Sequence, residues 1–291
     1  MENKQRIILT RLVTGSLLFF LLLRFTGQAT LSSLESPSLF TVDLDITYWL
    51  YKLSGLPALI IHNKTGAVLF DILLFCTGIL SFLFPLQRKW IIPFSILLFI
   101  YAISINTFST HHVGQVSGFM IVLWPFWVKD NYKFYLAWQG MRYYTCLVYL
   151  MAFTWKTCWN DSFYHFHQGV NSFKPNLFDY IYQNPDSLMT EIYHWFLRHE
   201  WVLNAGEKFI TILEGVMVIG LFTKKYDRRL FWVPVMIHGI TYFFSDVFFI
   251  ELLVIDLSLL SVSQLDRLGD WFYRLNSFPK LKKGEMTPLS R

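Results

Sequence analysis

A lysine stands between two tryptophans at the end of a strongly apolar stretch. The run "MAFTWKTCWNDSFYHFHQG", residues 151–169, sets Lys156 between Trp155 and Trp159. A lysine held in an apolar, aromatic setting loses its proton more easily than one in water, so its amine can act as a base. The simpler interpretation is that lysine and tryptophans anchor a helix at a membrane surface. The run alone does not decide between a base and a membrane anchor.

Two adjacent histidines fall at the same expected depth as this lysine. The segment "NTFSTHHVGQ" carries Asn106, His111 and His112 at a turn between two apolar windows. Histidine titrates near neutral pH, so these residues could share a site with Lys156. Two further histidine pairs are spaced two apart (165 and 167) and five apart (194 and 199), which does not place a ligand pair on one helical face. We therefore predict no metal site.

The composition is that of a membrane protein. Of the 291 residues, 54% are hydrophobic and only 15% are charged, against about 25% in an average soluble protein. The net charge of +5 is carried by short basic clusters between apolar windows, where topology signals occur, so we predict no nucleic-acid partner. The three cysteines are too scattered for a disulfide framework.

The apolar windows predict an all-α polytopic bundle of about eight transmembrane helices, because each is long enough to cross about 30 Å of hydrocarbon. They cover residues 7–27, 66–86, 90–108, 112–128, 135–156, 205–222, 230–247 and 248–263. Basic residues collect on one side of such a bundle, which places both termini in the cytoplasm, at the inner membrane if the source is bacterial.

Two long connections then face outward, at 28–65 and 157–204. Both contain aromatic stretches suited to interfacial helices, one of them beginning at Asp186 or Ser187 as N-cap. We expect one membrane unit, 1–265, followed by a basic cytoplasmic tail, 266–291.

Ionisable residues inside the apolar windows cost free energy to place in a membrane, so each is expected to serve either a function or a structural contact. Arg142, Glu214 and His238 lie at similar depths in three consecutive windows. They predict an intramembrane polar layer that forms either a proton path or a buried salt bridge. Arg24 and Asp71 share a depth near the outer end of the first two windows, and we expect a structural pair there.

The order of these features resembles a known family. Four stretches carry the likeness: "TRLVTGSLLFFLLLRF", "NTFSTHHVGQVSGFMIVLWPF", "RYYTCLVYLMAFTWKTCWNDSFYHFHQG" and "GEKFITILEGVMVIGLFTKKYDRRLFWVPVMIHGITYFF". Together they resemble the HTTM (horizontally transferred transmembrane) family, which includes the membrane domain of vitamin K-dependent gamma-carboxylase, over residues 5–265. The stretch "ILEGVMVIGLFTKKYDRR" is also similar to the DoxX-like group of quinone-linked membrane proteins.

The resemblance implies roles for particular residues. In the carboxylase, a lysine at the position matching Lys156 is the base for oxygenation of vitamin K hydroquinone, and a histidine matching His112 or His111 supports carboxylation, a lyase reaction. The chain departs from the family in lacking a glycine before its lysine, reading "AFTWK". It also has no segment matching the carboxylase's large lumenal domain, so carboxylation of a protein substrate is not expected.

Three hypotheses follow. The first is a membrane-embedded enzyme with Lys156 as base, a histidine partner, and Trp155, Trp159 and Asn106 around an isoprenoid quinone, hydroquinone or other lipid-like molecule. The second is a non-catalytic scaffold of the same fold that binds membrane lipids or a protein partner on the outer side. The third is a proton-linked transporter that uses the intramembrane polar layer.

Overall fold

The protein was described from a computed structural model, and it is helical throughout. The structure describes residues 3–26, 30–34, 46–108, 121–159, 163–164, 168–245, 250–261 and 263–268, and these ranges contain no β-strand. The all-α prediction is confirmed for them.

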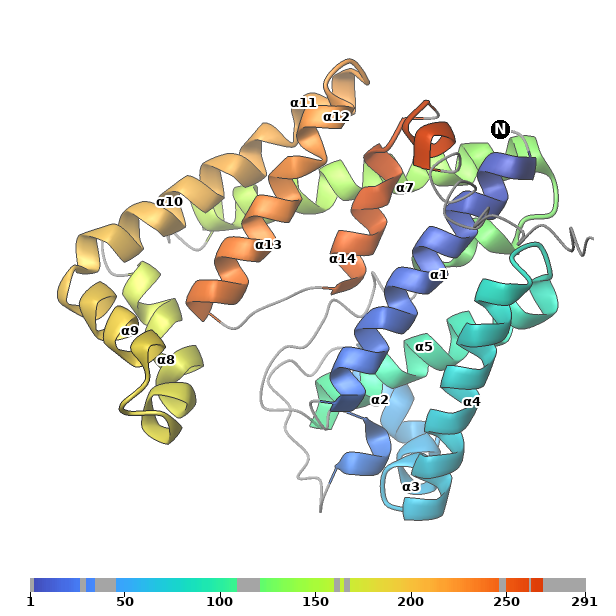
Figure 1. Cartoon of the computed structure of the whole chain (residues 1–291), viewed down its shortest axis with the longest axis horizontal. Coiled ribbons are helices and arrows are strands. Elements are labelled where there is room, and N and C mark those ends of the chain that lie inside the picture. The colour runs from blue at the N-terminus through green and yellow to red at the C-terminus, as the bar shows by residue number, and fades with distance from the viewer. Residues whose placement is uncertain are drawn as a thin grey trace, which may run out of the picture.

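The helices form two groups that a long helix joins (Figure 1). The N-terminal group contains α1 (Asn3–Thr26), the 3-10 helix η1 (Leu31–Ser33), α2 (Ile46–Leu53), α3 (Leu56–Ile60), α4 (Lys64–Leu83) and α5 (Arg88–Phe108). After the 3-10 helix η2 (Trp124–Trp127), α7 (Asn131–Thr154) runs from this group to the other and continues as a π-helix, η3 (Trp155–Trp159).

The second group packs against the C-terminal part of α7. It contains α8 (Gln168–Gln183), α9 (Leu188–Arg198), α10 (Glu200–Val216), α11 (Ile219–Phe222), α12 (Asp227–Leu230) and α13 (Trp232–Ser245). The short α14 (Ile250–Ile255) and the 3-10 helix η4 (Asp256–Leu259) lie between this group and α1 in Figure 1.

Three described helices are long and apolar enough to cross a membrane: α1, α4 and α5. They have 24, 20 and 21 residues, and about 20 are needed for 30 Å of hydrocarbon. α1 and α4 keep leucine and isoleucine side chains at least half exposed, as lipid-facing surfaces require, with examples at Leu23, Leu69 and Ile72. The structure therefore suggests membrane association, whereas eight crossings are not confirmed.

Several predicted windows differ from the structure. The window 248–263 contains only six residues of α14 and four of η4, because η4 tightens the helix and ends it at Leu259. The window 205–222 is interrupted at Met217 and Val218, between α10 and α11. Most of the window 112–128 lies outside the described residues, and its described end is the 3-10 helix η2.

Both predicted outer connections contain helices. α2 and α3 lie in 28–65, and α8 and α9 lie in 157–204. Ser187 is the N-cap of α9, where its side chain accepts a hydrogen bond from the Thr190 N–H, as predicted. Tyr51 attaches α2 to α5 through a 2.6 Å hydrogen bond between its hydroxyl and that of Ser104, and burial raises the pKa of Tyr51 to about 12.

The N-terminal group packs closely around a glycine of α4. Leu9, Val13 and Leu17 of α1 are fully buried against the same core as Leu74 of α4. At Gly78 a Cβ atom would stand 2.7 Å from Leu18 Cδ2 and 2.9 Å from Phe94 Cε2, so no side chain fits between α1, α4 and α5. Close approach at a small residue is a common way to pack helices in membranes.

Gly78→Ala is expected to destabilise this packing by about 1–3 kcal/mol, because the added methyl group overfills the contact. A fall in the melting temperature of the purified protein in detergent would show it. Gly140→Ala is the matched control, since its Cβ would meet nothing within 4 Å. Equal melting temperatures for the two variants would contradict the packing described here.

Candidate functional site

A polar stripe runs along one face of α7 and into η3. We define it as Arg142, Tyr149 and Lys156, which are spaced seven residues apart and therefore share a face at intervals of about 10.5 Å. Each member contacts at least one carboxylate of a neighbouring helix, as follows. The stripe and its partners therefore bring several buried polar and charged side chains together.

Lys156 turns its amine into the bundle. Its Nζ donates a 2.9 Å hydrogen bond to Glu214 Oε1 and lies 3.3 Å from Glu207 Oε1, both on α10. The side chains of the three residues are 24%, 8% and 20% exposed, in the order Lys156, Glu214 and Glu207. The second carboxylate oxygen of Glu214, Oε2, is buried and has no hydrogen-bond partner among the described residues. The lysine is therefore not a simple surface anchor.

Two local features bring this lysine to α10. The chain around Lys156 is a π-helix, a rare form that is often found at functional sites. Beside Glu214, Gly215 lies so close to Phe153 that a Cβ atom would stand 3.0 Å from its ring. Gly215 thus permits a close approach of α10 to α7 beside Lys156.

The middle of the stripe is a buried hydrogen-bonded chain. Tyr149 lies 2.8 Å from His238 Nε2 and donates to Asp256 Oδ2 at 3.2 Å. A phenol has one hydrogen, so when Tyr149 donates to Asp256 its oxygen accepts from His238 Nε2–H. Asp256 is 1% exposed, and its other oxygen has no hydrogen-bond partner within the described ranges. This chain ties α7 to α13 and η4.

Tyr149→Phe is expected to lower the free energy of unfolding by about 1–3 kcal/mol, because it removes one hydroxyl and leaves the Asp256 carboxylate without its partner. Thermal unfolding in detergent would measure the loss. Tyr143→Phe is the control on the same helix, since Tyr143 is 46% exposed. An unchanged melting temperature for Tyr149→Phe would show that the chain carries no stability.

Arg142 begins the stripe with a bidentate ion pair. Its Nε and Nη2 each donate to one oxygen of Asp227, both at 2.7 Å, and Nη2 also donates to Thr223 O at 2.9 Å. The pair fixes the turn between α11 and α12 against α7. Bidentate arginine–carboxylate pairs are among the strongest side-chain contacts in proteins.

The predicted layer of Arg142, Glu214 and His238 is therefore not one cluster. Arg142 pairs with Asp227, Glu214 pairs with Lys156, and His238 bonds to Tyr149. Similar depth in the sequence therefore does not imply contact, because each of the three groups hydrogen-bonds to another residue of the stripe or its partners.

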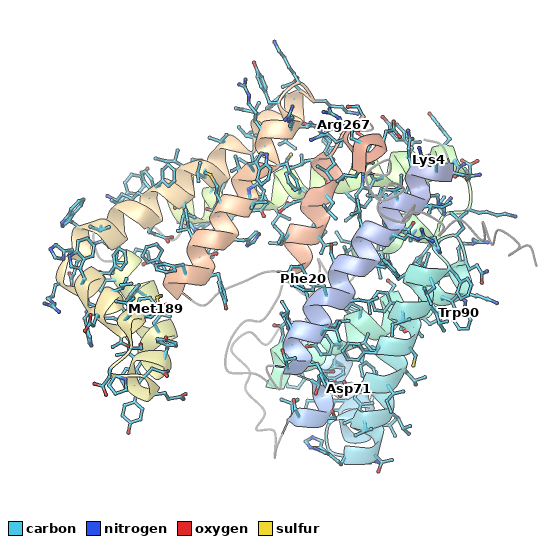
Figure 2. The ribbon with its side chains drawn as sticks, in the orientation of Figure 1. Lys4, Phe20, Asp71, Trp90, Met189 and Arg267 are labelled. Carbon is cyan, nitrogen blue, oxygen red and sulfur yellow. The ribbon has the colours of Figure 1, made fainter. Side chains whose placement is uncertain are left out.

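The predicted pair of Arg24 and Asp71 stays a prediction. Both oxygens of Asp71 accept backbone hydrogen bonds, from Leu31 N–H at 3.3 Å and Ser32 N–H at 2.8 Å. The free N–H groups at the start of η1 thus take the carboxylate, and Arg24 hydrogen-bonds to Tyr101 of α5, which also lies close to Asp71. Figure 2 shows that Asp71 lies toward the end of α4 that is farther from Lys4.

The remaining predicted site residues are not gathered around Lys156. His111 and His112 lie outside the described residues. Asn106 is on the last part of α5, whose C-terminal end lies well away from that of α7 in Figure 1. Trp155 and Trp159 are 58% and 70% exposed, so their rings point away from the bundle.

Three residues of the stripe and its partners were not predicted from the sequence: Asp227, Tyr149 and Asp256. Asp227 lies in "KKYDRR", which we interpreted as a topology signal and not as a source of a carboxylate. Asp256 stands inside the apolar run "LLVIDLSLL", and its charge there was a sufficient signal. Tyr149 has no sequence signal besides its spacing of seven from Arg142 and Lys156.

No group of three or more histidine, cysteine, aspartate or glutamate side chains is arranged to hold a metal within the described part of the chain. Comparison of the chain with protein-family models, with curated proteins and with solved structures gives no match.

Proposed function

We propose that the chain is a multi-pass membrane enzyme of the HTTM type in which Lys156 accepts a proton from a hydrophobic, hydroquinone-like substrate. The observation that carries the proposal is the position of the Lys156 amine, which turns inward to a buried carboxylate instead of outward to headgroups. The resemblance of the surrounding sequence to the carboxylase membrane domain supports the same role for this position.

The two carboxylates give the amine a route for its proton. An ammonium cannot act as a base, so Lys156 must first hand a proton to Glu214 or Glu207, which lie within 3.3 Å. Glu214 can take it along the 2.9 Å hydrogen bond to Oε1, whose carboxylic O–H would then donate back to the neutral amine. The neutral amine then accepts one hydroxyl proton of the hydroquinone. Dioxygen takes the two electrons together with both protons, one directly from the second hydroxyl and one from the lysine, and leaves as hydrogen peroxide.

The apolar setting suits such a substrate. Trp155 and Trp159 give the outer side of η3 exposed aromatic surface, against which the isoprenoid tail can pack while the amine faces α10. The membrane supplies the substrate laterally, and both termini are proposed to lie in the cytoplasm, with Lys156 toward the outer leaflet.

The test is oxidation of a reduced isoprenoid quinone by the purified protein in lipid nanodiscs under air, followed by absorbance of the quinone and by oxygen consumption. We expect a rate above that of protein-free nanodiscs that saturates with hydroquinone. A rate equal to that of empty nanodiscs, for ubiquinol-, menaquinol- and phylloquinol-type substrates alike, would contradict the proposal.

A second candidate function, proton-linked transport, is favoured by the stripe itself. Its three members span about 21 Å of α7, from Arg142 to Lys156, and each contacts a carboxylate. Chains of such groups serve as proton relays in pumps and transporters. Acidification of proteoliposomes under a proton gradient, lost in Asp256→Asn, would support transport in place of oxidation.

A further inference from the structure

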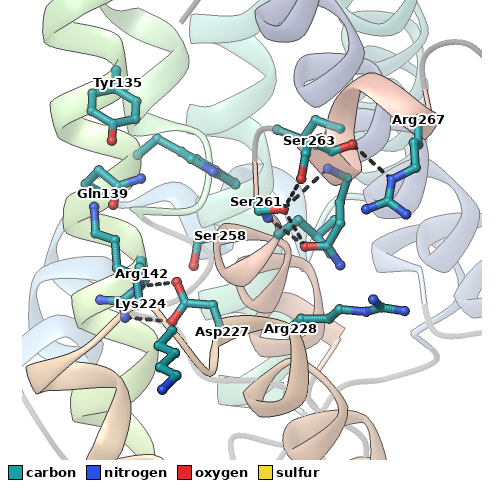
Figure 3. A pocket seen from close by; sticks show the side chains of 15 residues that line it. Tyr135, Gln139, Arg142, Lys224, Asp227, Arg228, Ser258, Ser261, Ser263 and Arg267 are labelled. Atoms are coloured by element: carbon teal, nitrogen blue, oxygen red, sulfur yellow. Dashed lines mark hydrogen bonds and ion pairs between the residues drawn. The ribbon is translucent and has the colours of Figure 1, made fainter.

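A cavity of about 370 Å³ opens where the second helix group meets the chain after η4. Figure 3 shows its lining, which comes from three segments: α7 with Tyr135, Gln139 and Arg142, the turn at 224–228, and residues 258–267. It lies at the inner end of the polar stripe, beyond the ion pair of Arg142 and Asp227.

The lining is strongly cationic. It contains five basic side chains and one carboxylate, that of Asp227, and both oxygens of this carboxylate are occupied by Arg142. Four cations therefore remain without an anionic partner in the cavity: Lys224, Lys225, Arg228 and Arg267.

The weak contacts of these four cations leave them available. Lys224 lies 6.0 Å from the Tyr135 ring centre, and Arg267 donates only to the Ser263 backbone, at 3.3 Å. Arg228 makes no hydrogen bond or ion pair with any residue that the structure describes. All four residues are exposed, and like charges around one cavity give it a positive potential that attracts anions.

A buried donor in the same lining also lacks an acceptor. Trp138 is 2% exposed and lines the cavity, and its indole N–H has no hydrogen-bond partner among the described residues. An indole nitrogen can only donate, so it requires an oxygen that the protein does not supply here. The nitrogen has almost no accessible surface, so it lies behind the lining, and the cations are the groups that can meet an anion in the cavity.

We propose that this cavity binds a phosphate group, either as the headgroup of an anionic phospholipid or as a soluble phosphate. A phosphate ester offers several acceptor oxygens and at least one negative charge, which match the four cations. The volume suits a headgroup. Arg267 and Lys4, at the start of the apolar helix α1, lie toward the same end of the molecule in Figure 2, where headgroups would be within reach.

Calorimetric titration of the full chain in neutral detergent tests the proposal with three probes: dihexanoyl phosphatidic acid, dihexanoyl phosphatidylcholine and inorganic phosphate. We expect phosphatidic acid to bind and phosphatidylcholine to bind at least about tenfold more weakly. If inorganic phosphate binds as tightly as phosphatidic acid, the ligand is a soluble phosphate; if it binds more weakly, the ligand is the lipid headgroup.

The Lys224→Gln/Arg228→Gln variant is expected to weaken phosphatidic acid binding about tenfold or more. The matched control, Lys52→Gln/Lys89→Gln, removes the same charge from two lysines that lie over tryptophan rings elsewhere. Melting temperatures will show that both variants fold, and Arg267→Gln serves as a second variant if the first does not. Equal binding of the two lipids, or equal weakening by the control, would overturn the proposal.

Discussion

Lys156→Ala is expected to lower the rate of hydroquinone oxidation by about 10²–10⁴-fold, the range that a positioned general base contributes. The substitution removes the amine that lies 2.9 Å from Glu214 and leaves that buried carboxylate without its cation. The measurement is initial quinone formation in nanodiscs at saturating substrate. If the lysine were only an anchor at the membrane surface, the rate would not change.

The control for this variant is Lys174→Ala. Lys174 lies on α8 and faces Glu200 at 3.8 Å, with side chains 58% and 43% exposed, so it is a surface ion pair on the same side of the molecule. We expect its loss to leave the rate unchanged, since such pairs contribute little. Glu214→Gln should also lower the rate, because the amide cannot accept the proton that Lys156 must release. A wild-type rate in Glu214→Gln would remove this carboxylate from the mechanism.

Asp227→Ala is expected to lower the free energy of unfolding by about 3–5 kcal/mol, the cost of leaving a buried charge without its partner. Arg142 is 1% exposed, so its buried guanidinium would lose the carboxylate that accepts two of its hydrogen bonds. Loss of folded protein after solubilisation, or a melting temperature well below that of the wild type, would show this. Glu200→Gln is the control in an exposed pair.

The double variant Arg142→Met/Asp227→Leu tests whether stability requires the ion pair itself or only that no buried charge is left unpaired. Replacing both charges by apolar groups of similar size is often neutral, so we expect most of the lost stability to return. A double variant as unstable as Asp227→Ala would mean that this position requires the ion pair itself, for example to hold the turn through Thr223 O.

The helices were predictable because their signals are local. Apolar windows and the N-cap at Ser187 follow from neighbouring residues, and α1, α4 and α5 agree with their windows to within a few residues. The window ending at 263 failed because apolar content alone does not report where a helix tightens into the 3-10 turn of η4. The apolar window is therefore longer than the helix that forms within it.

The partners of the polar residues were not predictable, because pairing depends on how helices rotate and tilt. Depth along separate windows placed Glu214 beside Arg142, whereas the close approach of α7 and α10 at Gly215 brings it to Lys156. The spacing of seven between Arg142, Tyr149 and Lys156 was visible in the sequence. Its meaning required knowing that the same face of α7 meets α10, α13 and η4.

The sharpest test of the central claim is the oxidation rate of Lys156→Arg measured beside wild type and Lys156→Ala. Arginine keeps the positive charge and can still pair with Glu207 and Glu214, but it stays protonated and cannot accept a proton. The account predicts that Lys156→Arg is as inactive as Lys156→Ala while its melting temperature stays near that of the wild type. A Lys156→Arg protein that oxidises hydroquinone at the wild-type rate would contradict the account, because the lysine would then serve only as a charge.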